Sequence, residues 1–176
     1  MRSWIPVPET TTGRLVYAAL ELFGAHGYAP VGVSTIASHA GVTTGSLYHH
    51  FGSKEGLYHL VRSDVEQRVV DRLEGAAATT EVGAVSELAP VLLVGFDYLV
   101  SSGFLRLLGE PSPESPDGTP RPDPVEELVD RLLGGQQTPM PALVAAAWRT
   151  ALWHASDGPD AAHHARAAVA HLLTGS

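Results

Sequence analysis

Apolar residues recur along the chain with helical spacing, and no stretch shows the sustained apolar–polar alternation of a half-buried strand. The first apolar stripe is spaced by three and four residues, which places it on one side of a helix. Its members are Leu15, Ala18, Ala19, Leu22 and Phe23. Gly27 follows, where a glycine in the left-handed conformation commonly ends a helix. The pattern therefore predicts an all-α fold that begins with an amphipathic helix.

Two short helices and one long helix are expected next. Residues 33–40 form the first, and Gly41 supplies the turn to a second short helix over residues 44–50. Ser53 is suited to cap the long helix, because its hydroxyl can accept a hydrogen bond from a backbone N–H of the first turn. We expect that helix to end near Glu74.

The rest of the chain also follows a helical pattern. Small residues at positions 75–80 predict a joint, and Pro90 must either start a helix or kink one. Six prolines between positions 110 and 124 predict a loop. Further helices are expected over residues 82–100, 104–108, 124–133, 141–155 and 159–173, and Asp123-Pro124 opens the third of them.

Composition and charge narrow the classes of function. The chain has 176 residues and no cysteine, which excludes disulfides, thiol catalysis and cysteine-based zinc sites. Its net charge is −8, but residues 1–74 hold six Lys/Arg against seven Asp/Glu, so the first part is compatible with nucleic-acid binding. The longest apolar run is far shorter than the ~20 residues of a membrane span, and no secretory leader is recognised. A cytoplasmic protein without membrane association is expected.

Two short helices joined by a glycine turn, after a longer first helix, form a helix-turn-helix arrangement. Ala37 and Gly41 are small where the short helices must cross closely, and Val42 and Leu47 supply the shared core. The chain then reads SLYHHFGSKEGL. Residues 19–61, which contain all of these features, resemble the DNA-binding domain of the TetR family of transcriptional regulators.

The resemblance implies an N-terminal three-helix helix-turn-helix DNA-binding domain joined to a helical-bundle domain for ligand binding and dimerisation. The corresponding boundaries are residues 1–52 for the DNA-binding domain, 53–75 for a connecting helix and 76–176 for the C-terminal domain. The implied partners are a double-stranded DNA operator, a small-molecule effector and a second copy of the chain. The implied function is a repressor that the effector releases from a palindromic operator.

Small polar residues open the predicted recognition helix. Backbone N–H groups and the positive end of the helix dipole gather there, which suits phosphate oxygens, while hydroxyls can bond base edges. Gly45 lets the backbone approach DNA closely. By resemblance, the DNA-contacting residues are Thr43, Thr44, Gly45, Ser46, Tyr48, His49, Lys54, Ser34 and Arg14.

Several of these positions also have a structural interpretation. Thr43 is suited to cap the helix, and Tyr48 could serve packing alone. His50 either packs beside Phe51 or faces solvent. The family often has basic residues at positions 34 and 44, where this chain has Ser34 and Thr44, so the salt dependence of DNA binding should be shallow.

Aromatic and apolar residues of the second part could line an effector pocket or simply form a core. The predicted pocket residues are Phe96, Asp97, Val100, Phe104, Leu108 and Trp148. Asp97 could bind a cationic or hydroxylated ligand, or face solvent beside Arg106. Small residues of the last two helices predict a dimer interface. Its predicted members are Ala145, Leu152, Ala161, Ala165, Ala168 and Leu172.

An enzyme or a small-molecule-binding protein built on a helical bundle is the alternative from a different class of function. The chain lacks a nucleophile–base pair, a phosphate-binding glycine loop after a strand, and metal-ligand spacing, so an enzyme is not expected and neither is a cofactor or a metal site. The histidines His163, His164 and His171 have no carboxylate or cysteine cluster beside them. A constitutive repressor or adaptor that senses no ligand stays open, because the second part has no specific motif.

Overall fold

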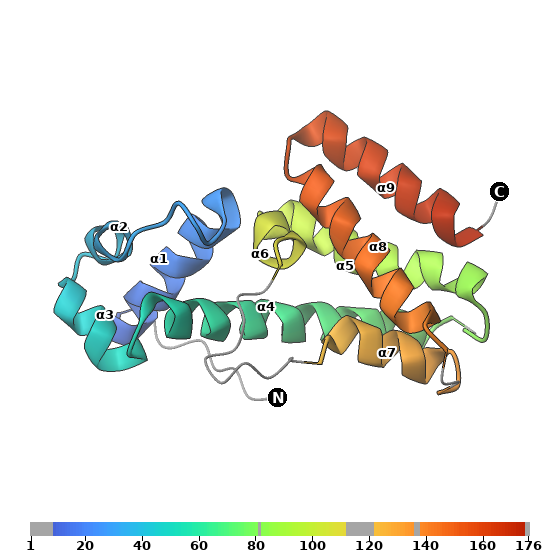
Figure 1. Cartoon of the computed structure of the whole chain (residues 1–176), viewed down its shortest axis with the longest axis horizontal. Coiled ribbons are helices and arrows are strands. Elements are labelled where there is room, and N and C mark those ends of the chain that lie inside the picture. Colours follow the sequence, from blue (N-terminus) through green and yellow to red (C-terminus); the bar gives the residue numbers. More distant parts are fainter. Residues whose placement is uncertain (1–8, 81, 112–121, 136–137, 175–176) are drawn as a thin grey trace. The chain divides into compact units, whose positions relative to one another are not determined.

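The computed structural model describes residues 9–80, 82–111, 122–135 and 138–174. Within these ranges the chain forms nine α-helices, one short 3-10 helix and no strand (Figure 1), which confirms the predicted all-α fold. The chain divides into two compact units, Met1–Val65 and Glu66–Ser176. The division falls inside the long fourth helix, α4 (Lys54–Ala77).

Three helices and the start of α4 make up the first unit. They are α1 (Thr11–His26), α2 (Val33–His39) and α3 (Thr44–Phe51). Their apolar stripes meet in a core whose fully buried members are Leu15, Phe23, Ile36, Leu47, Leu57 and Tyr58. The rings of Phe23 and Tyr58 meet edge to face, with centroids 5.1 Å apart.

Two helix boundaries predicted from the sequence, the end at Gly27 and the cap at Ser53, are confirmed in this unit. Thr10 caps α1 by accepting a hydrogen bond from the Gly13 N–H (2.9 Å), and Gly27 ends the helix at φ +79°. Ser53 caps α4 by accepting from the Gly56 N–H at 2.9 Å. A Cβ on Gly56 would overlap the backbone carbonyl oxygen of Phe51, so glycine is required there for close packing of consecutive helices.

The predicted end of the fourth helix was wrong by three residues. The helix runs to Ala77, and Gly75 lies inside it rather than in a joint. Nothing lies within 4 Å of the position that a Cβ would take on Gly75, so no close packing partner explains this glycine.

The second unit is a bundle in which α8 (Met140–Ala155) packs against α9, α6 and α7. The other helices of this unit are α5 (Leu88–Ser102), α6 (Leu105–Gly109), α7 (Pro124–Leu132) and α9 (Pro159–Thr174). Pro90 lies in the first turn of α5, where its missing N–H costs nothing. The predicted loop at residues 110–124 falls largely on positions 112–121, which lie outside the described residues.

Gly109 allows α6 to approach the backbone of α8 closely. A Cβ on this last residue of α6 would lie 2.7 Å from the backbone nitrogen of Trp153 and 2.9 Å from its Cα, so α6 packs directly on the backbone of α8. Nearby, the fully buried indole of Trp148 donates a hydrogen bond to the carbonyl of Leu92 at 3.1 Å.

One segment of the described chain, Val85–Ser102, has the length and composition of a membrane-spanning helix. Its side chains have another explanation, because Leu88, Leu92, Phe96 and Leu99 are buried with at most 1% of their surface exposed. The segment therefore forms part of the core of the second unit, with 39% of it buried.

Candidate nucleic-acid interface

The two short helices α2 and α3 are joined by a tight turn at Gly41. Gly41 has φ +63°, a conformation that L side chains rarely adopt, and the Val42 N–H donates to the Ala37 carbonyl at 2.9 Å. Ile36, Ala37 and Leu47 are at most 2% exposed. The turn and the shared core fix the angle between the helices, so α3 presents one face to the domain and the other to solvent.

The N-terminal turn of α3 presents small polar groups. Thr43 is the N-cap, and its Oγ1 accepts from the Ser46 N–H at 3.2 Å and contacts the Ser46 hydroxyl at 3.0 Å. Thr44 and Gly45 are exposed, and their backbone N–H groups have no acceptor within the helix because they precede its first intrahelical bond. The arrangement offers N–H groups, hydroxyls and the positive end of a helix dipole to an incoming anion.

The last turn of α3 presents aromatic and imidazole rings. Tyr48 is 54% exposed, so it is not a core residue. His49 and His50 are exposed neighbours with ring centroids 5.1 Å apart. Nδ1 of His50 lies 3.4 Å from the hydroxyl oxygen of Thr12 on α1. His50 is therefore exposed beside α1, and it was not among the predicted DNA contacts.

Arg14 and Ser34 place further polar groups around the turn. Arg14 is exposed on α1, and its Nη1 lies 3.8 Å from the position that a Cβ would take on Gly41. Ser34 is exposed in the first turn of α2. The guanidinium of Arg14 therefore lies beside the turn that leads into α3.

Lys54 has a structural role that the sequence analysis missed. Its ammonium donates to the carbonyls of Tyr28 and Val31, both at 3.0 Å, and lies 3.9 Å from the centroid of the Tyr28 ring. Burial lowers the pKa of this ammonium from its ordinary value. Lys54 thus ties the first turn of α4 to the loop between α1 and α2, and the predicted phosphate contact would have to use its remaining N–H.

The six predicted pocket residues do not share one face of the second unit. Phe96, Leu108 and Trp148 are buried, but Val100 is 41% exposed. Asp97 is exposed and ion-paired with Arg166 of α9, through hydrogen bonds of 2.7 and 2.9 Å, whereas the sequence left open a ligand contact or a solvent-facing position beside Arg106. The surface positions of Asp97 and Val100 remove them from the wall of any internal pocket, while half-buried Phe104 and the three buried residues remain.

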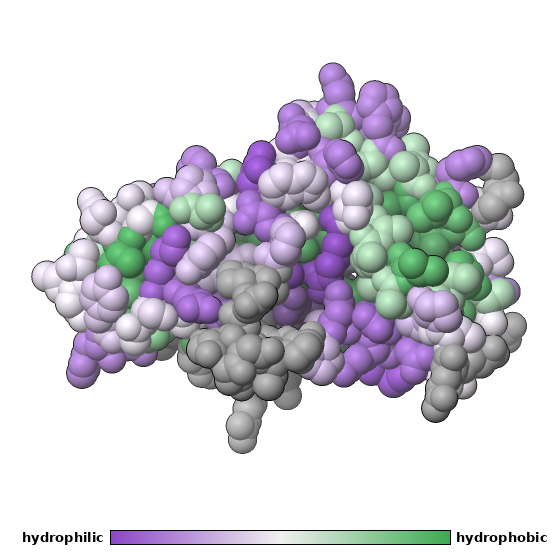
Figure 2. Space-filling view, in the orientation of Figure 1, coloured by the Kyte–Doolittle hydropathy of each residue, from purple (hydrophilic) through white to green (hydrophobic). Residues whose placement is uncertain are grey.

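The predicted dimer residues also divide into two groups. Ala145, Leu152 and Ala165 are at most 7% exposed because they pack within the bundle, so they are not available to a second chain. Ala161 is half-buried, whereas Ala168 and Leu172 are exposed. Hydrophobic surface gathers over α8 and the C-terminal end of α9 (Figure 2). The large exposed hydrophobic residues of α8 and α9 are Met140, Leu143, Trp153 and Leu172.

A polar cluster inside the second unit was also missed by the sequence analysis. Arg149 of α8 bonds Asp123, the N-cap of α7, and its Nη2 lies 3.5 Å from a carboxylate oxygen of Glu66. The sequence identified Asp123 as a helix start but gave no sign of its partner. By contrast, the described residues contain no group of three His, Asp or Glu side chains placed to bind a metal ion.

Comparison with known proteins agrees with the helix-turn-helix geometry. Residues 15–61 match the family described as bacterial regulatory proteins, tetR family. The chain is 36% identical to the HTH-type transcriptional regulatory protein RaaS of Mycobacterium tuberculosis over an alignment of 100 residues, which covers 53% of this chain and 45% of that protein. The chain thus spans about half the length of this curated relative. The matched family is one of regulatory proteins.

Solved structures resemble nearly the whole fold. A TetR-family transcriptional regulator from Pectobacterium atrosepticum superposes with a TM-score of 0.61 at 22% identity, covering 92% of this chain and 91% of that one. The fatty acid degradation regulator FadR from Bacillus halodurans superposes with a TM-score of 0.65 at 18% identity, covering 93% and 98%. At these identities the likeness establishes the fold of both units and nothing about what the second unit binds.

Proposed function

The chain belongs to the TetR family of bacterial regulatory proteins, and we propose that it is a cytoplasmic, dimeric DNA-binding repressor which a small molecule releases from its operator. The observation that carries the proposal is the exposed N-terminal turn of α3. Its cap, small residues and unbonded N–H groups face solvent, while Leu47 holds the opposite face of the helix in the core.

In this proposal each part of α3 has its own task. Thr44 and Ser46 read base edges with their hydroxyls, Gly45 allows close approach, and Tyr48 bonds a phosphate. Thr43 keeps the first turn in place through its bonds to Ser46. Around them, Arg14, Ser34, His49 and the remaining N–H of Lys54 meet the phosphate backbone.

A homodimer follows from the geometry of DNA reading. Two recognition helices must enter successive major grooves about one helical turn apart, which a two-fold dimer achieves on a palindromic operator. The exposed apolar surface of α8 and α9 supports this part of the proposal, with Leu143, Trp153, Ala168 and Leu172 in the interface.

The test of DNA recognition starts from duplexes selected in vitro by the full chain. We expect Thr44→Ala/Tyr48→Ala to lose about 2–5 kcal/mol of binding free energy for the selected sequence, because it removes base and phosphate contacts. Thr150→Ala, an exposed threonine on α8, is the matched control. Unchanged affinity of the double variant would remove these residues from the interface, and failure to select any duplex would refute DNA binding itself.

A repressor without an effector is the second candidate, because Phe96 and Trp148, two of the predicted pocket residues, are buried in the core of the second unit. A thermal-shift screen separates the two. A ligand that binds only the folded chain raises its melting temperature. A compound that both stabilises the chain and weakens operator binding supports the sensing repressor, whereas operator binding indifferent to every stabilising compound supports the constitutive one.

A further inference from the structure

The DNA-binding unit presents few permanent cations. Among its described residues the Lys and Arg side chains are Arg14, Lys54 and Arg62. Arg62 is 3% exposed and bonds the Tyr58 hydroxyl, and Lys54 bonds two carbonyls, so Arg14 is the exposed one in this part of the chain. DNA affinity depends strongly on cations that neutralise phosphates. The described part of this unit therefore offers DNA one exposed Arg side chain, and further positive charge would strengthen binding.

Two histidines lie on α3, the proposed recognition helix, where positive charge would favour phosphate binding. His49 and His50 are adjacent, exposed and in the last turn of α3, the end of a helix where its dipole favours a positive charge. Imidazole is the side chain that gains a proton near neutral pH, and each protonated ring has two N–H donors. The pair thus places two convertible cations on the helix that carries the proposed base-reading residues.

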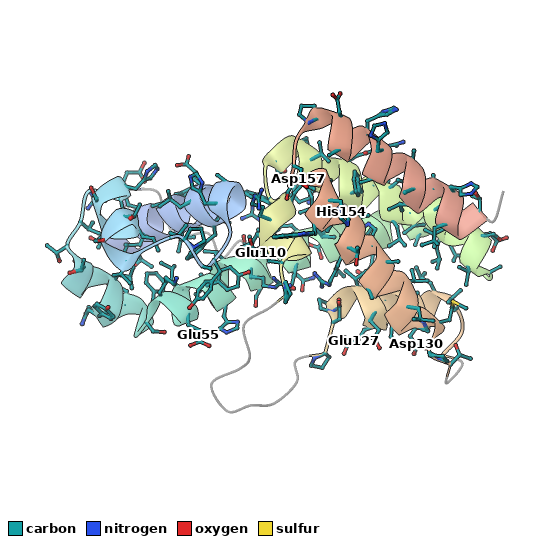
Figure 3. The ribbon with its side chains drawn as sticks, turned by 45° about the horizontal axis from the view of Figure 1, so that its top comes forward. Glu55, Glu110, Glu127, Asp130, His154 and Asp157 are labelled. Carbon is teal, nitrogen blue, oxygen red and sulfur yellow. The ribbon has the colours of Figure 1, made fainter. Side chains whose placement is uncertain are left out.

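Nothing in the described residues neutralises this pair. The carboxylate of Glu21 on α1 bonds His39 of α2 at 2.7 Å, and Glu55, in the first turn of α4 (Figure 3), lies 3.6 Å from His59. No carboxylate of the described chain forms an ion pair with either ring of the pair. In the first unit, the charged and titratable side chains on the elements around α3 are Arg14, Tyr17, Glu21, His26, His39, Lys54, Glu55, Tyr58, His59, Arg62 and Asp64.

The contact between His50 and Thr12 is also compatible with a protonated imidazole. The Thr12 hydroxyl oxygen, 3.4 Å from Nδ1 of His50, can accept a hydrogen bond from that nitrogen once it is protonated. The N–H of His50 Nε2 would then remain available for another acceptor. Two charged rings 5.1 Å apart repel each other, so an anion from outside the protein is needed to hold both charges.

We propose that His49 and His50 form a proton-linked phosphate-binding pair, which takes up one or two protons when duplex DNA binds and donates N–H groups to its phosphodiester oxygens. This inference rests on the proposed function, since it needs α3 to face DNA. Its consequence is that operator affinity rises as the pH falls from about 8 to about 6. The chain would then hold its operator more tightly in an acidified cell.

The experiment measures binding of the full chain to an in vitro selected duplex by fluorescence anisotropy, over a range of KCl concentrations at about pH 6 and about pH 8. We expect affinity to be about tenfold higher at the lower pH for one proton taken up. The slope of log K against log salt should steepen by about 1–2, because each added phosphate contact contributes about 0.9.

His49→Gln/His50→Gln keeps hydrogen-bonding side chains but cannot gain a proton, so we expect it to lose both pH effects. His163→Gln/His164→Gln is the matched control, because these adjacent rings on α9 have centroids 6.0 Å apart and lie in the other unit. It should behave as the unmodified chain. Circular dichroism at both pH values checks the fold. If the double variant does not fold, the two single variants take its place, and each should lose about half of the change in slope.

Two outcomes overturn the inference: the same salt slope at both pH values in the unmodified chain, or pH dependence that persists in the histidine variants. Either can occur with intact operator binding, and the proposed function then stands. Failure of the unmodified chain to bind any duplex at either pH would instead refute the proposed function, and this inference with it.

Discussion

The carboxylate of Asp123 accepts two parallel hydrogen bonds from the guanidinium of Arg149, one from Nε and one from Nη2, the latter at 2.7 Å. The same carboxylate caps α7 by accepting from the Val125 N–H at 2.9 Å. Arg149 also donates through Nη1 to the Leu108 carbonyl at 3.0 Å, and Nη2 lies 3.5 Å from Glu66 of α4. One side chain of α8 thus connects three other helices of the second unit.

We expect Arg149→Met to lower the free energy of unfolding by about 3 kcal/mol at neutral pH, because it leaves Asp123 without its partner in a half-buried site. Burial by itself raises the pKa of Asp123, but the hydrogen bonds and charge of Arg149, with the Val125 and Glu126 N–H groups, bring it below its ordinary value. The pair therefore stabilises the fold fully above about pH 4, and this contribution is lost as the pH falls through the lowered pKa.

Urea unfolding at about pH 7 and about pH 4 checks this prediction. In the variant, burial without Arg149 raises the pKa of Asp123, so the carboxylate is neutralised in acid and the loss should shrink there. Arg166→Met is the matched control, because Arg166 binds Asp97 with the same two-bond geometry but both side chains are about half exposed. It should cost under about 1 kcal/mol. Equal losses in the two variants would contradict a special role for the buried pair.

Substitutions of Lys54 and Arg14 should distinguish a cation that stabilises the fold from one that binds DNA. We expect Lys54→Met to destabilise the chain by about 2 kcal/mol, because two carbonyls of the α1–α2 loop lose their donor. Arg14→Met should leave stability within about 0.5 kcal/mol, since Arg14 is exposed, but should reduce the salt slope of DNA binding by about 1. Thermal unfolding and salt titrations of operator binding measure both quantities. A larger slope change for Lys54→Met than for Arg14→Met would reverse the assignment.

Whether a feature could be predicted from the sequence depends on how far apart in the chain its interacting residues lie. Helical periodicity and capping act within a few residues, so Gly27, Ser53 and the Asp123 start of α7 were recognised without a structure. The partners of Lys54 and Arg149 lie more than twenty positions away, and only packing brings them together.

Helical spacing also leaves the direction of a small residue undetermined. Alanines lie on several sides of the last two helices, and periodicity cannot say which side meets the bundle and which meets solvent. Ala145 and Ala165 proved to face inward, while Ala168 faces outward. Asp97 illustrates the same limit, because its partner Arg166 was no more predictable than Arg106 from position alone.

Gly109→Ala and Gly75→Ala should change stability in opposite directions. We expect Gly109→Ala to cost about 1–3 kcal/mol, because the new methyl group would overlap the backbone of α8 at Trp153. Gly75 lies in the last turn of α4 with open space around it, so Gly75→Ala should stabilise by about 0.5 kcal/mol. Urea unfolding measures both. Stabilisation by Gly109→Ala would show that α6 and α8 can separate without cost.

Charge on the exposed surface of α8 and α9 should disrupt the proposed dimer. Leu143 and Leu172 are 60% and 62% exposed, so replacing both by Asp removes no core contact from the single chain. A charge in the apolar centre of an interface must lose its hydration without a partner, which costs several kcal/mol. We expect Leu143→Asp/Leu172→Asp to sediment as a folded monomer at concentrations where the unmodified chain is a dimer.

The monomer should also bind a palindromic operator far more weakly, because two linked recognition helices gain from effective concentration and a single one does not. Val100→Asp is the matched control, since Val100 is a 41% exposed hydrophobic residue of the same unit that lies on α5. It should remain dimeric and keep its operator affinity. If Val100→Asp dissociates the dimer and the α8–α9 variant does not, the interface lies on α5 instead, and the spacing of the two recognition helices must be derived from that face.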